Sequence, residues 1–412
     1  MFVPAATGDR RAVSSLGRAL TLVHTRQATR RSELTDLLGL TRTATGSVLR
    51  ELERLRLVRS DPRSGPASKG NQTGRPSHRL QIHPQAPIAL AVQVQAETLL
   101  VARVHLGGTL QHVAEVPLPQ RHDPEVVLVQ AADQLDAELD AVNRHCVGVG
   151  VAVPSAVADN GAALAAMTLS WPPEVPVRDA LMRLLAARGH SSLPVQVGND
   201  ANLAALAEHR HGAGQGASDL LYLMTGQRGV GGALVIHGRL HTGSAGYALE
   251  VGHLTVQPGG RPCYCGNSGC LEVETDPAAL LAAASRAPAE PALAAARAVI
   301  ADRHGDPDAH AAVHAVTERL AIGMAGLVNI LNPDRILLAG LHADLLAADQ
   351  THLQDTLARR SFLEHAAHID LRPSRLVHAG LLGAGELAFQ NLLDDPRQAP
   401  AVSRRSSANR PG

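Results

Sequence analysis

The 412-residue sequence is poor in aromatic side chains and cysteine, and each shortage narrows the kinds of core and of cellular compartment that the protein can have. Phe, Tyr and Trp make up only 2% of the chain, so any core must be built from Leu, Val and Ala. Four cysteines are too few for a disulfide framework and favour a reducing compartment. No apolar run reaches the roughly 18 residues of a membrane span, and the start lacks the apolar segment of a signal peptide. These shortages predict a cytoplasmic protein with no membrane partner. The length of 412 residues predicts two or three domains.

The net charge is zero overall but is unevenly distributed along the chain. Residues 10–79 contain fifteen Arg or Lys and five Asp or Glu, a net charge of +10, so the remainder carries −10. A basic N-terminal module on an acidic body indicates that only the first part meets a polyanion. A solvated basic surface without a partner is the plainer interpretation of the charge taken alone.

Three of the four cysteines lie close together in a glycine-containing loop. Cys263, Cys265 and Cys270 fall within eight residues, and His253 lies ten positions before the first of them. Thiolates and imidazole are the ligands that tetrahedral Zn²⁺ prefers, and three Cys with one His make a closed, structural site. The alternative is a disulfide with a spare thiol, but Cys-x-Cys is a poor spacing for a disulfide. The loop therefore predicts one structural zinc ion per chain.

The basic segment has the helix pattern of a helix-turn-helix. Leu16 to Val23 carries apolar residues at helical spacing, and Arg31 to Leu40 predicts a second helix with Gly39 as its C-cap. Thr41 is a suitable N-cap for a third helix. That helix is expected to run to about residue 55, and its predicted inward-facing positions are Val48, Leu52 and Leu55.

A loop rich in Gly, Pro and Ser (residues 61–77) follows, with a strand-like segment on either side, which predicts a winged helix. The small, polar and basic start of the third helix can enter a major groove. Cations on the wing can neutralise phosphates. The predicted DNA-binding residues are Thr41, Arg42, Thr43, Thr45, Ser47 and Arg50 on the helix and Arg63, Lys69 and Arg75 on the wing. The alternative is a small helical dimerisation domain followed by a linker.

Two stretches resemble one known family. Thr73-Gly-Arg-Pro-Ser77, followed by Leu80-x-Ile82-x-Pro84, is similar to the junction between wing and body in repressors of the ROK family. That family groups bacterial repressors, open reading frames and sugar kinases. The Cys-x-Cys-Gly-x-x-Gly-Cys-x-Glu loop with its upstream Gly-His resembles the ROK zinc signature. The likeness runs from about residue 15 to 395 and points to regulators of the xylose and N-acetylglucosamine repressor type.

The resemblance implies an α/β fold, in which a winged helix-turn-helix precedes a two-lobed, actin-like (RNase H-like) body with a zinc loop. The implied division is a DNA-binding domain at 1–85, a first lobe at 86–200 completed by a C-terminal helix at about 381–396, a second lobe at 201–380 and a disordered tail at 397–412. The chain's own pattern agrees with this fold. Apolar, β-rich runs at Ile88–Val104 and Val147–Val153 flank a helix candidate at Val126–Leu139.

The resemblance also implies a sugar site between the lobes. ROK sugar kinases meet the sugar with an Asn-Asp pair, which matches Asn199-Asp200 here, and the other family contacts match Glu250, His253 and Glu272. Carboxylates suit sugars because each accepts hydrogen bonds from two vicinal hydroxyls. Asp200 alone is equally a helix N-cap, and the two glutamates alone are equally surface ion-pair residues. Together with the metal loop they favour a ligand site.

A sugar kinase also needs two phosphate loops, and both differ here from the family pattern. Gln93, Gln95 and Glu97 occupy the stretch in which the family has Asp-x-Gly-Gly/Ala-Thr. In the second loop, Gln227 and Arg228 stand where the family has Gly-Thr. Glycine loops bind phosphate through bare backbone N–H groups, which long side chains obstruct. The prediction is therefore that the protein binds no ATP and is not an enzyme.

The sequence as a whole predicts a sugar-responsive DNA-binding regulator of carbohydrate genes, most simply a repressor. We expect it in the bacterial cytoplasm, bound to operator DNA in the nucleoid as a homodimer or homotetramer. The alternatives are a ROK-type kinase that phosphorylates hexoses with ATP, and a ligand-independent DNA-binding protein with a degenerate kinase body. Three residues depart from expected patterns: Leu249 and Ser155 stand where the family has Gly, and Arg56 stands where helix-turn-helix proteins often place Gly.

Overall fold

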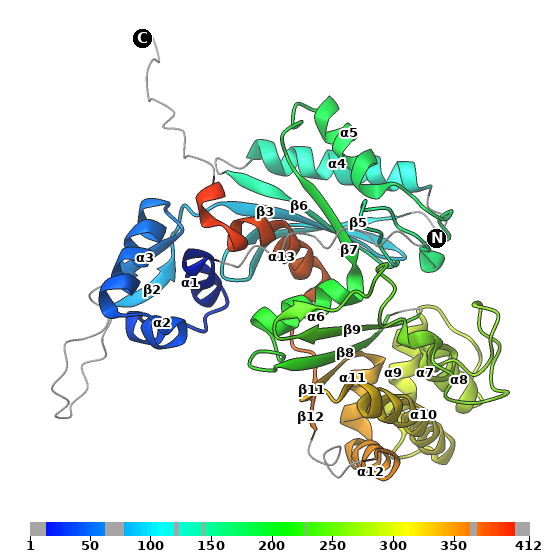
Figure 1. The fold of residues 1–412 in the computed structure, drawn as a ribbon. Helices are drawn as coiled ribbons and strands as arrows, with labels where there is room; N and C mark the ends of the chain where they lie inside the picture. The colour runs from blue at the N-terminus through cyan, green and yellow to red at the C-terminus, as the bar shows by residue number, and fades with distance from the viewer. Residues whose placement is uncertain are drawn as a thin grey trace, which may run out of the picture.

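The computed structural model describes residues 14–61, 78–118, 123–141, 145–226, 229–362 and 369–399. Figure 1 shows an N-terminal module (described residues 14–61 and 78–85) beside a body of two lobes. Each lobe is built around a five-stranded sheet. The C-terminal helix α13 (Ala379–Asp394) returns to the first lobe and lies against the N-terminal module. The two-lobed α/β body implied by the resemblance is therefore present.

The N-terminal module has the expected three helices followed by a two-stranded ribbon. These elements are α1 (Ser15–His24), α2 (Arg31–Leu38), α3 (Arg42–Arg54), β1 (Val58–Asp61) and β2 (Arg79–Ile82), with β1 and β2 antiparallel. Gly39 ends α2 in the left-handed region, with φ 64°. Thr41 caps α3 by accepting a hydrogen bond from the N–H of Ala44 at 3.3 Å. Arg56, between α3 and β1, has φ 55°, a conformation that favours glycine.

The buried face of α3 is rotated by about one residue from the predicted one. Leu49 and Leu52 are fully packed, whereas Val48 and Leu55 are only partly buried. Thr45 and Gly46 complete the inward face, and Gly46 leaves room for the Arg31 side chain, whose Nη2 would lie 2.6 Å from a Cβ there. The prediction followed the apolar residues alone, whereas the small residues at 45 and 46 also pack inward, and the Arg31 side chain takes the space beside Gly46.

The first lobe has strand order β5-β4-β3-β6-β7. Its strands are β3 (Ile88–Val94), β4 (Thr98–His105), β5 (Thr109–Pro117), β6 (Cys146–Val153) and β7 (Val195–Asn199). The run expected at 88–104 is thus two antiparallel strands joined by a tight turn. One face of the sheet packs on α4 (Pro124–Ala141) and α5 (Val177–Ala187), and the other face packs on α13. Trp171 is buried among the residues of the α4–α5 side.

The second lobe has strand order β10-β9-β8-β11-β12. Its strands are β8 (Asp219–Thr225), β9 (Val230–Ile236), β10 (Arg239–Leu240), β11 (Arg335–Gly340) and β12 (Asp370–Pro373). The helices on one face are α7 (Leu271–Thr275), α8 (Pro277–Ala283), α9 (Ala292–Asp302), α10 (Pro307–Leu331), α11 (Leu341–Ala348) and α12 (Gln350–Arg360). By length and composition alone α10 could cross a membrane, but 61% of its most apolar 18-residue window is buried inside the protein, as in a core helix.

Two helices in direct contact join the lobes. α6 (Asp200–His211) follows β7, packs on the open face of the second sheet and crosses α13 at backbone distance. A Cβ on Gly383 of α13 would lie 1.9 Å from the carbonyl oxygen of Leu203 on α6, so only glycine permits this crossing. After α13 the chain forms one further short turn, Pro396–Gln398, where a disordered tail had been expected to begin. Residues 400–412 lie outside the described residues.

Candidate functional site

The four predicted zinc ligands lie together in the second lobe. His253 ends a short 3-10 turn (Val251–His253), and Cys270 directly precedes α7. The ligand atoms of the four residues all lie within 4.8 Å of one another. The Cys263 Sγ lies 3.7 Å from the His253 Nδ1, and the Cys265 Sγ lies 3.7 Å from the Cys270 Sγ. Zinc–sulfur bonds of about 2.3 Å in a tetrahedron separate two sulfurs by about 3.8 Å, so this donor set fits one zinc ion.

The loop that carries the cysteines is fixed by its own hydrogen bonds. The backbone N–H of Cys263 donates to the carbonyl oxygen of Asn267 at 2.8 Å. Glu274, buried under the loop, accepts from the N–H of Arg261 at 2.7 Å. Gly269 has φ 69°, and a Cβ there would lie 1.6 Å from the carbonyl oxygen of Gln257. These contacts restrict the backbone of the loop that carries the sulfur atoms.

All five predicted sugar-contact residues line one cavity between the lobes. Its volume is about 400 Å³, within the usual range of small-molecule sites. Besides Asn199, Asp200, Glu250, His253 and Glu272, its lining includes Pro154, Ser155, Met167, Thr168, Tyr247 and Tyr264. Residues far apart in the sequence thus converge on a single pocket that carries three carboxylates.

The Asn199-Asp200 pair lies where β7 becomes α6. Asn199 is the N-cap: its Oδ1 accepts from the N–H of Asn202 at 2.9 Å, and its Nδ2 donates to the Ser155 carbonyl at 3.1 Å. Asp200 is the first residue of the helix, with one carboxylate oxygen accepting from the N–H of Ala201 at 2.8 Å. The capping role that Asp200 alone could have filled therefore falls to Asn199, and Asp200 faces the pocket.

Burial shapes the electrostatics of the pocket. It raises the pKa of Asp200 to about 6, with the nearby Glu250 adding to the shift. Burial also raises the pKa values of Glu250 and Glu272. Glu272 is 6% exposed and accepts a hydrogen bond from the N–H of Val230 at 3.1 Å. The three carboxylates can accept hydrogen bonds from hydroxyl groups, and Asp200 can also take up a proton near neutral pH.

Tyr264 is a pocket residue that the sequence reasoning missed. It lies between two of the cysteines, and its hydroxyl donates to the Glu272 Oε2 at 3.4 Å and lies 3.4 Å from the His253 Nε2. The same histidine faces Cys263 with its Nδ1, so one imidazole borders both the metal donors and the pocket. The sequence could have indicated this role, because Tyr264 lies between Cys263 and Cys265, and a residue between two metal ligands must lie close to the metal site.

The two departures from family glycines at the pocket have different structural outcomes. Leu249 has φ 65°, so a branched side chain occupies a left-handed position next to Glu250, at a cost of about 1–2 kcal/mol. Ser155 is buried, and its hydroxyl donates to the carbonyl of Ala156 at 2.8 Å and accepts from the N–H of Ala165 at 3.0 Å. Leu249 therefore stores backbone strain, whereas Ser155 stabilises the pocket wall.

A second cavity of about 270 Å³ adjoins the first and shares Asp200 with it. Gln93 and Gln95 line this cavity. Gln93 is buried, and its Nε2 would lie 2.6 Å from a Cβ on Gly380, so its amide fills space beside the start of α13. Gln95 lies in the turn from β3 to β4, where its Oε1 accepts from the Thr98 hydroxyl at 2.9 Å. The residues Gln227 and Arg228 of the second loop lie outside the described residues.

The N-terminal module exposes most of the predicted DNA-binding residues of α3. Those exposed are Thr41, Arg42, Thr43, Ser47 and Arg50. Thr45 requires a correction: it is fully buried, and its hydroxyl donates to the Thr41 carbonyl at 3.1 Å, which leaves it unavailable to a groove. The wing residues Arg63, Lys69 and Arg75 lie outside the described residues.

Residues 90–391, which include both lobes and the cysteine loop, match the ROK family. The chain belongs to the ROK family. It is 31% identical over 270 residues to a glucokinase of Halalkalibacterium halodurans, covering 61% of this chain and 79% of the relative. It is 30% identical over 270 residues to the xylose repressor of Caldicellulosiruptor bescii, covering 62% of this chain and 66% of the repressor. Its ROK relatives therefore include both repressors and sugar kinases.

Solved ROK structures show the same division. A ROK family transcriptional regulator, a homologue of the Escherichia coli MLC protein, superposes with a TM-score of 0.72 at 22% identity, covering 92% of this chain and 96% of the regulator. The ROK glucokinase of Streptomyces griseus in complex with glucose and AMPPNP superposes with a TM-score of 0.60 at 26% identity, covering 74% of this chain and 99% of the kinase. The regulator thus shares the fold over more of this ROK chain than the kinase does.

Proposed function

We propose that this ROK protein is a DNA-binding transcriptional regulator whose body senses a sugar. The observation that carries the proposal is the basic N-terminal module packed on the body, with an exposed, polar and basic α3. Three helices and an antiparallel ribbon in this order make a winged helix, in which α3 enters the major groove. The proposed contacts are Thr41, Arg42, Thr43, Ser47 and Arg50, with the wing cations binding phosphates.

The sugar role of the body is supported by the unequal state of its two cavities. The first cavity gathers an Asn-Asp pair, two further carboxylates and an imidazole, which suit the vicinal hydroxyls of a sugar. In the second, Gln93 and Gln95 project where an ATP phosphate chain needs bare backbone and a metal carboxylate. We propose that the body binds a sugar or a sugar derivative without transferring phosphate to it.

Zinc would be structural in this scheme. Cys263, Cys265, Cys270 and the Nδ1 of His253 would fill its four positions, so none is left for a reacting water molecule. Metal at Nδ1 requires the proton of a neutral imidazole to be on Nε2, which then donates into the pocket. The ion would thus orient one hydrogen-bond donor toward the sugar.

Binding would act on DNA by a shift between two populations. Sugar contacts from both lobes, such as Asp200 on α6 and Glu250 on the second lobe, favour the closed body. In a homodimer, a different lobe angle changes the separation of the two α3 helices, which must match half-sites about 34 Å apart. Operator affinity therefore depends on the sugar.

The test begins with duplexes selected from a random pool by the full-length, zinc-loaded protein. Affinity for the selected duplex is then measured at one salt concentration with and without glucose, xylose and N-acetylmannosamine, since phosphate contacts make affinity salt-dependent. We expect one sugar to change the affinity by about 5–150-fold, the usual range of allosteric coupling. Selection without enrichment would refute DNA binding, and enrichment without any sugar effect would refute the sensor role.

Sugar phosphorylation is the second candidate, because Asp200 has a pKa of about 6 and can accept a hydroxyl proton. It is tested by a coupled assay with ATP, Mg²⁺ and the same sugars. Steady turnover that disappears in Asp200→Asn would establish a kinase and overturn the regulator proposal.

A further inference from the structure

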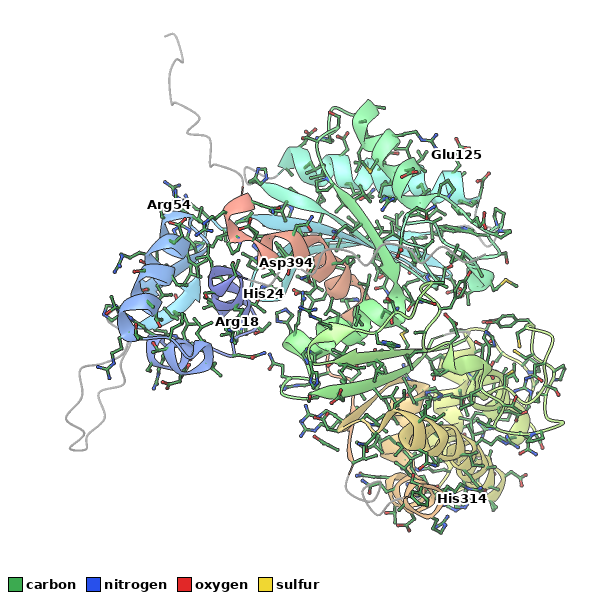
Figure 2. All side chains as sticks on the ribbon, viewed as in Figure 1. Arg18, His24, Arg54, Glu125, His314 and Asp394 are labelled. Carbon is green, nitrogen blue, oxygen red and sulfur yellow. The ribbon has the colours of Figure 1, made fainter. Side chains whose placement is uncertain are left out.

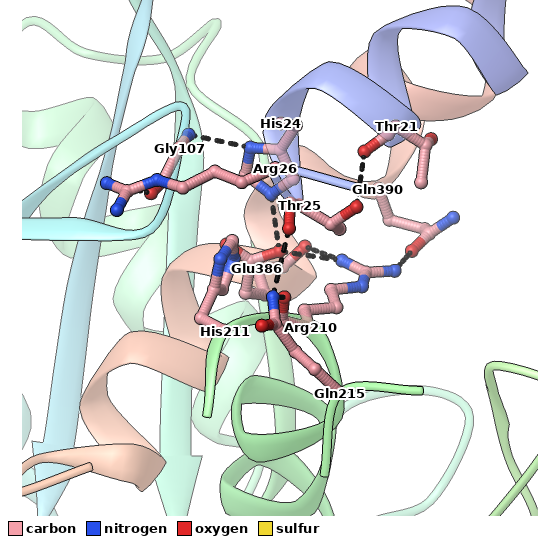
Figure 3. A network of polar contacts seen from close by, with 10 residues as sticks. All are labelled: Thr21, His24, Thr25, Arg26, Gly107, Arg210, His211, Gln215, Glu386 and Gln390. Atoms are coloured by element: carbon pink, nitrogen blue, oxygen red, sulfur yellow. Dashed lines mark hydrogen bonds and ion pairs between the residues drawn. The ribbon is translucent and has the colours of Figure 1, made fainter. Parts of the chain in front are cut away.

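The end of helix α1 is bound to the body through a buried carboxylate. His24 is the last residue of α1 and lies between the N-terminal module and α13 (Figure 2). Its Nε2 lies 2.8 Å from the Glu386 Oε2 of α13, and both side chains are 0% exposed. The same carboxylate binds Arg210 at 2.9 Å and His211 at 2.9 Å, both from the end of α6 (Figure 3). One carboxylate therefore joins the N-terminal module, α6 and α13.

The hydrogen bonds of His24 fix its proton. The backbone N–H of Gly107, in the turn from β4 to β5, donates to the His24 Nδ1 at 2.8 Å. Nδ1 therefore carries no proton, so the ring is neutral and its Nε2 donates to Glu386. Burial also lowers the pKa of His24. Every polar atom of this imidazole is thus bonded to the first lobe, so the first lobe holds the end of α1 at a defined position.

A second connection reaches the same end of α1 from the other lobe. The Gln215 Nε2 donates to the Thr25 carbonyl at 2.9 Å and to the Arg210 carbonyl at 2.6 Å (Figure 3). Gln215 follows α6, and its own carbonyl accepts from the Nη1 of Arg335 at 2.8 Å. Arg335 begins β11 in the second sheet. The backbone after α1 is thus bonded to a segment anchored in the second lobe.

Helix α6 connects this junction to the pocket. Its first residue, Asp200, lines the cavity, and its last residues, Arg210 and His211, bind Glu386. Twelve residues at 1.5 Å each make a rigid connection of about 18 Å. A change in lobe angle around a sugar must alter the distance between Gln215 on the second-lobe side and Glu386 on the first-lobe side.

We propose that residues 24–26 form the joint through which closure of the lobes on a sugar turns the DNA-binding module. Glu386 holds this joint to the first lobe, Gln215 holds it to the second, and a rotation between the lobes moves one anchor relative to the other. The proposal rests on the proposed function of the body as a sugar sensor. It names the segment that transmits sugar binding to the DNA-binding module. It predicts that, without the Gln215 anchor, the protein still binds sugar and DNA but sugar no longer changes DNA affinity.

The test is Gln215→Ala in the full-length, zinc-loaded protein, with glucose and xylose as probes. The matched control is Gln390→Ala. Gln390 also bonds Arg210, its Oε1 accepting from the guanidinium at 2.8 Å, but it has no hydrogen bond to residues 24–26 among those of the described chain. We expect Gln215→Ala to keep its sugar affinity and its sugar-free operator affinity within about twofold of the natural values. The ratio of operator affinities with and without sugar should shrink by about fivefold for each hydrogen bond removed. Gln390→Ala keeps the full effect.

Amide hydrogen exchange of residues 25–28 gives a second measurement that does not depend on DNA. Sugar is expected to change their exchange in the natural protein and in Gln390→Ala, but not in Gln215→Ala. If sugar changes the operator affinity of Gln215→Ala as much as that of the natural protein, the proposed joint is refuted but the sensor role is not. The same holds if sugar changes the amide exchange of residues 25–28 equally in both proteins. A natural protein whose operator affinity responds to none of glucose, xylose and N-acetylmannosamine refutes the proposed sensor role, and the joint with it.

Discussion

Replacing Glu386 by alanine should weaken the whole assembly rather than α13 alone. The carboxylate is fully buried and is bound by His24, Arg210 and His211 at 2.8–2.9 Å. Its removal leaves the Arg210 guanidinium, itself largely buried, without its charged partner. Truncating one partner of a buried ion pair typically costs about 3–5 kcal/mol, so Glu386→Ala is expected to lose that much unfolding free energy. Gln390→Ala is the control: it removes a hydrogen bond from the Arg210 guanidinium but leaves the ion pair with Glu386, so it should lose less, about 1.5–3 kcal/mol.

The assay is urea unfolding followed by circular dichroism, at pH 7.5 and again at pH values stepped down below 4, where the folded carboxylate takes up its proton. Burial alone would raise the pKa of Glu386, but electrostatic attraction to His24 and His211, together with the hydrogen bonds from both side chains, holds it well below its ordinary value. A carboxyl group with a depressed folded pKa stabilises fully above its unfolded pKa of about 4.3, and this contribution disappears as pH falls through the folded pKa. The gap between the natural protein and Glu386→Ala should therefore narrow in acid. A gap below about 1 kcal/mol at pH 7.5 would refute the network as a source of stability.

Three further predictions follow from the site and the backbone. Cys263→Ser should release about one zinc per chain, measured by metal analysis, and abolish the sugar effect on DNA; a full effect in the metal-free variant would contradict the link between loop and pocket. Asp200→Asn should raise the melting temperature at pH 7.5 but not near pH 4. Because the folded pKa of Asp200 is raised to about 6, the ionised carboxylate destabilises the folded protein above that pH, and stability recovers as pH falls. An equal gain at both pH values would contradict the shift. Arg56→Gly should raise the unfolding free energy by up to about 1 kcal/mol by relieving φ 55°, whereas Arg56→Ala should give no gain.

Local features of this chain were predictable from the sequence because their physics is local. Gly39 and Thr41 end and begin helices through contacts within four residues, and the structure places both as predicted. The grouping of Cys263, Cys265 and Cys270 was likewise visible in one loop. The position of the sugar-side residues followed from the family resemblance, which supplies pairings across the chain that periodicity does not.

Features that depend on distant contacts were not predictable in the same way. His24 and Glu386 are 362 residues apart in the sequence, and neither carries a local signal of its partner. Thr45 faces inward with its hydroxyl bonded to the Thr41 carbonyl, and a polar residue on the buried face is not encoded by apolar periodicity. The β-rich run at 88–104 is confirmed as strand structure, but its division into the antiparallel strands β3 and β4 depends on their pairing, which the apolar pattern does not show.

One apolar cluster runs without interruption from the N-terminal module into the body. Leu16, Leu20 and Val23 of α1 belong to the same buried cluster as Phe389 and Leu392 of α13. Helix α13, which completes the first lobe, is therefore also the apolar surface on which the N-terminal module packs. Removal of the N-terminal module from this chain would expose these apolar α13 side chains to water, so the stability of the first lobe depends on the module as well as on its own sheet.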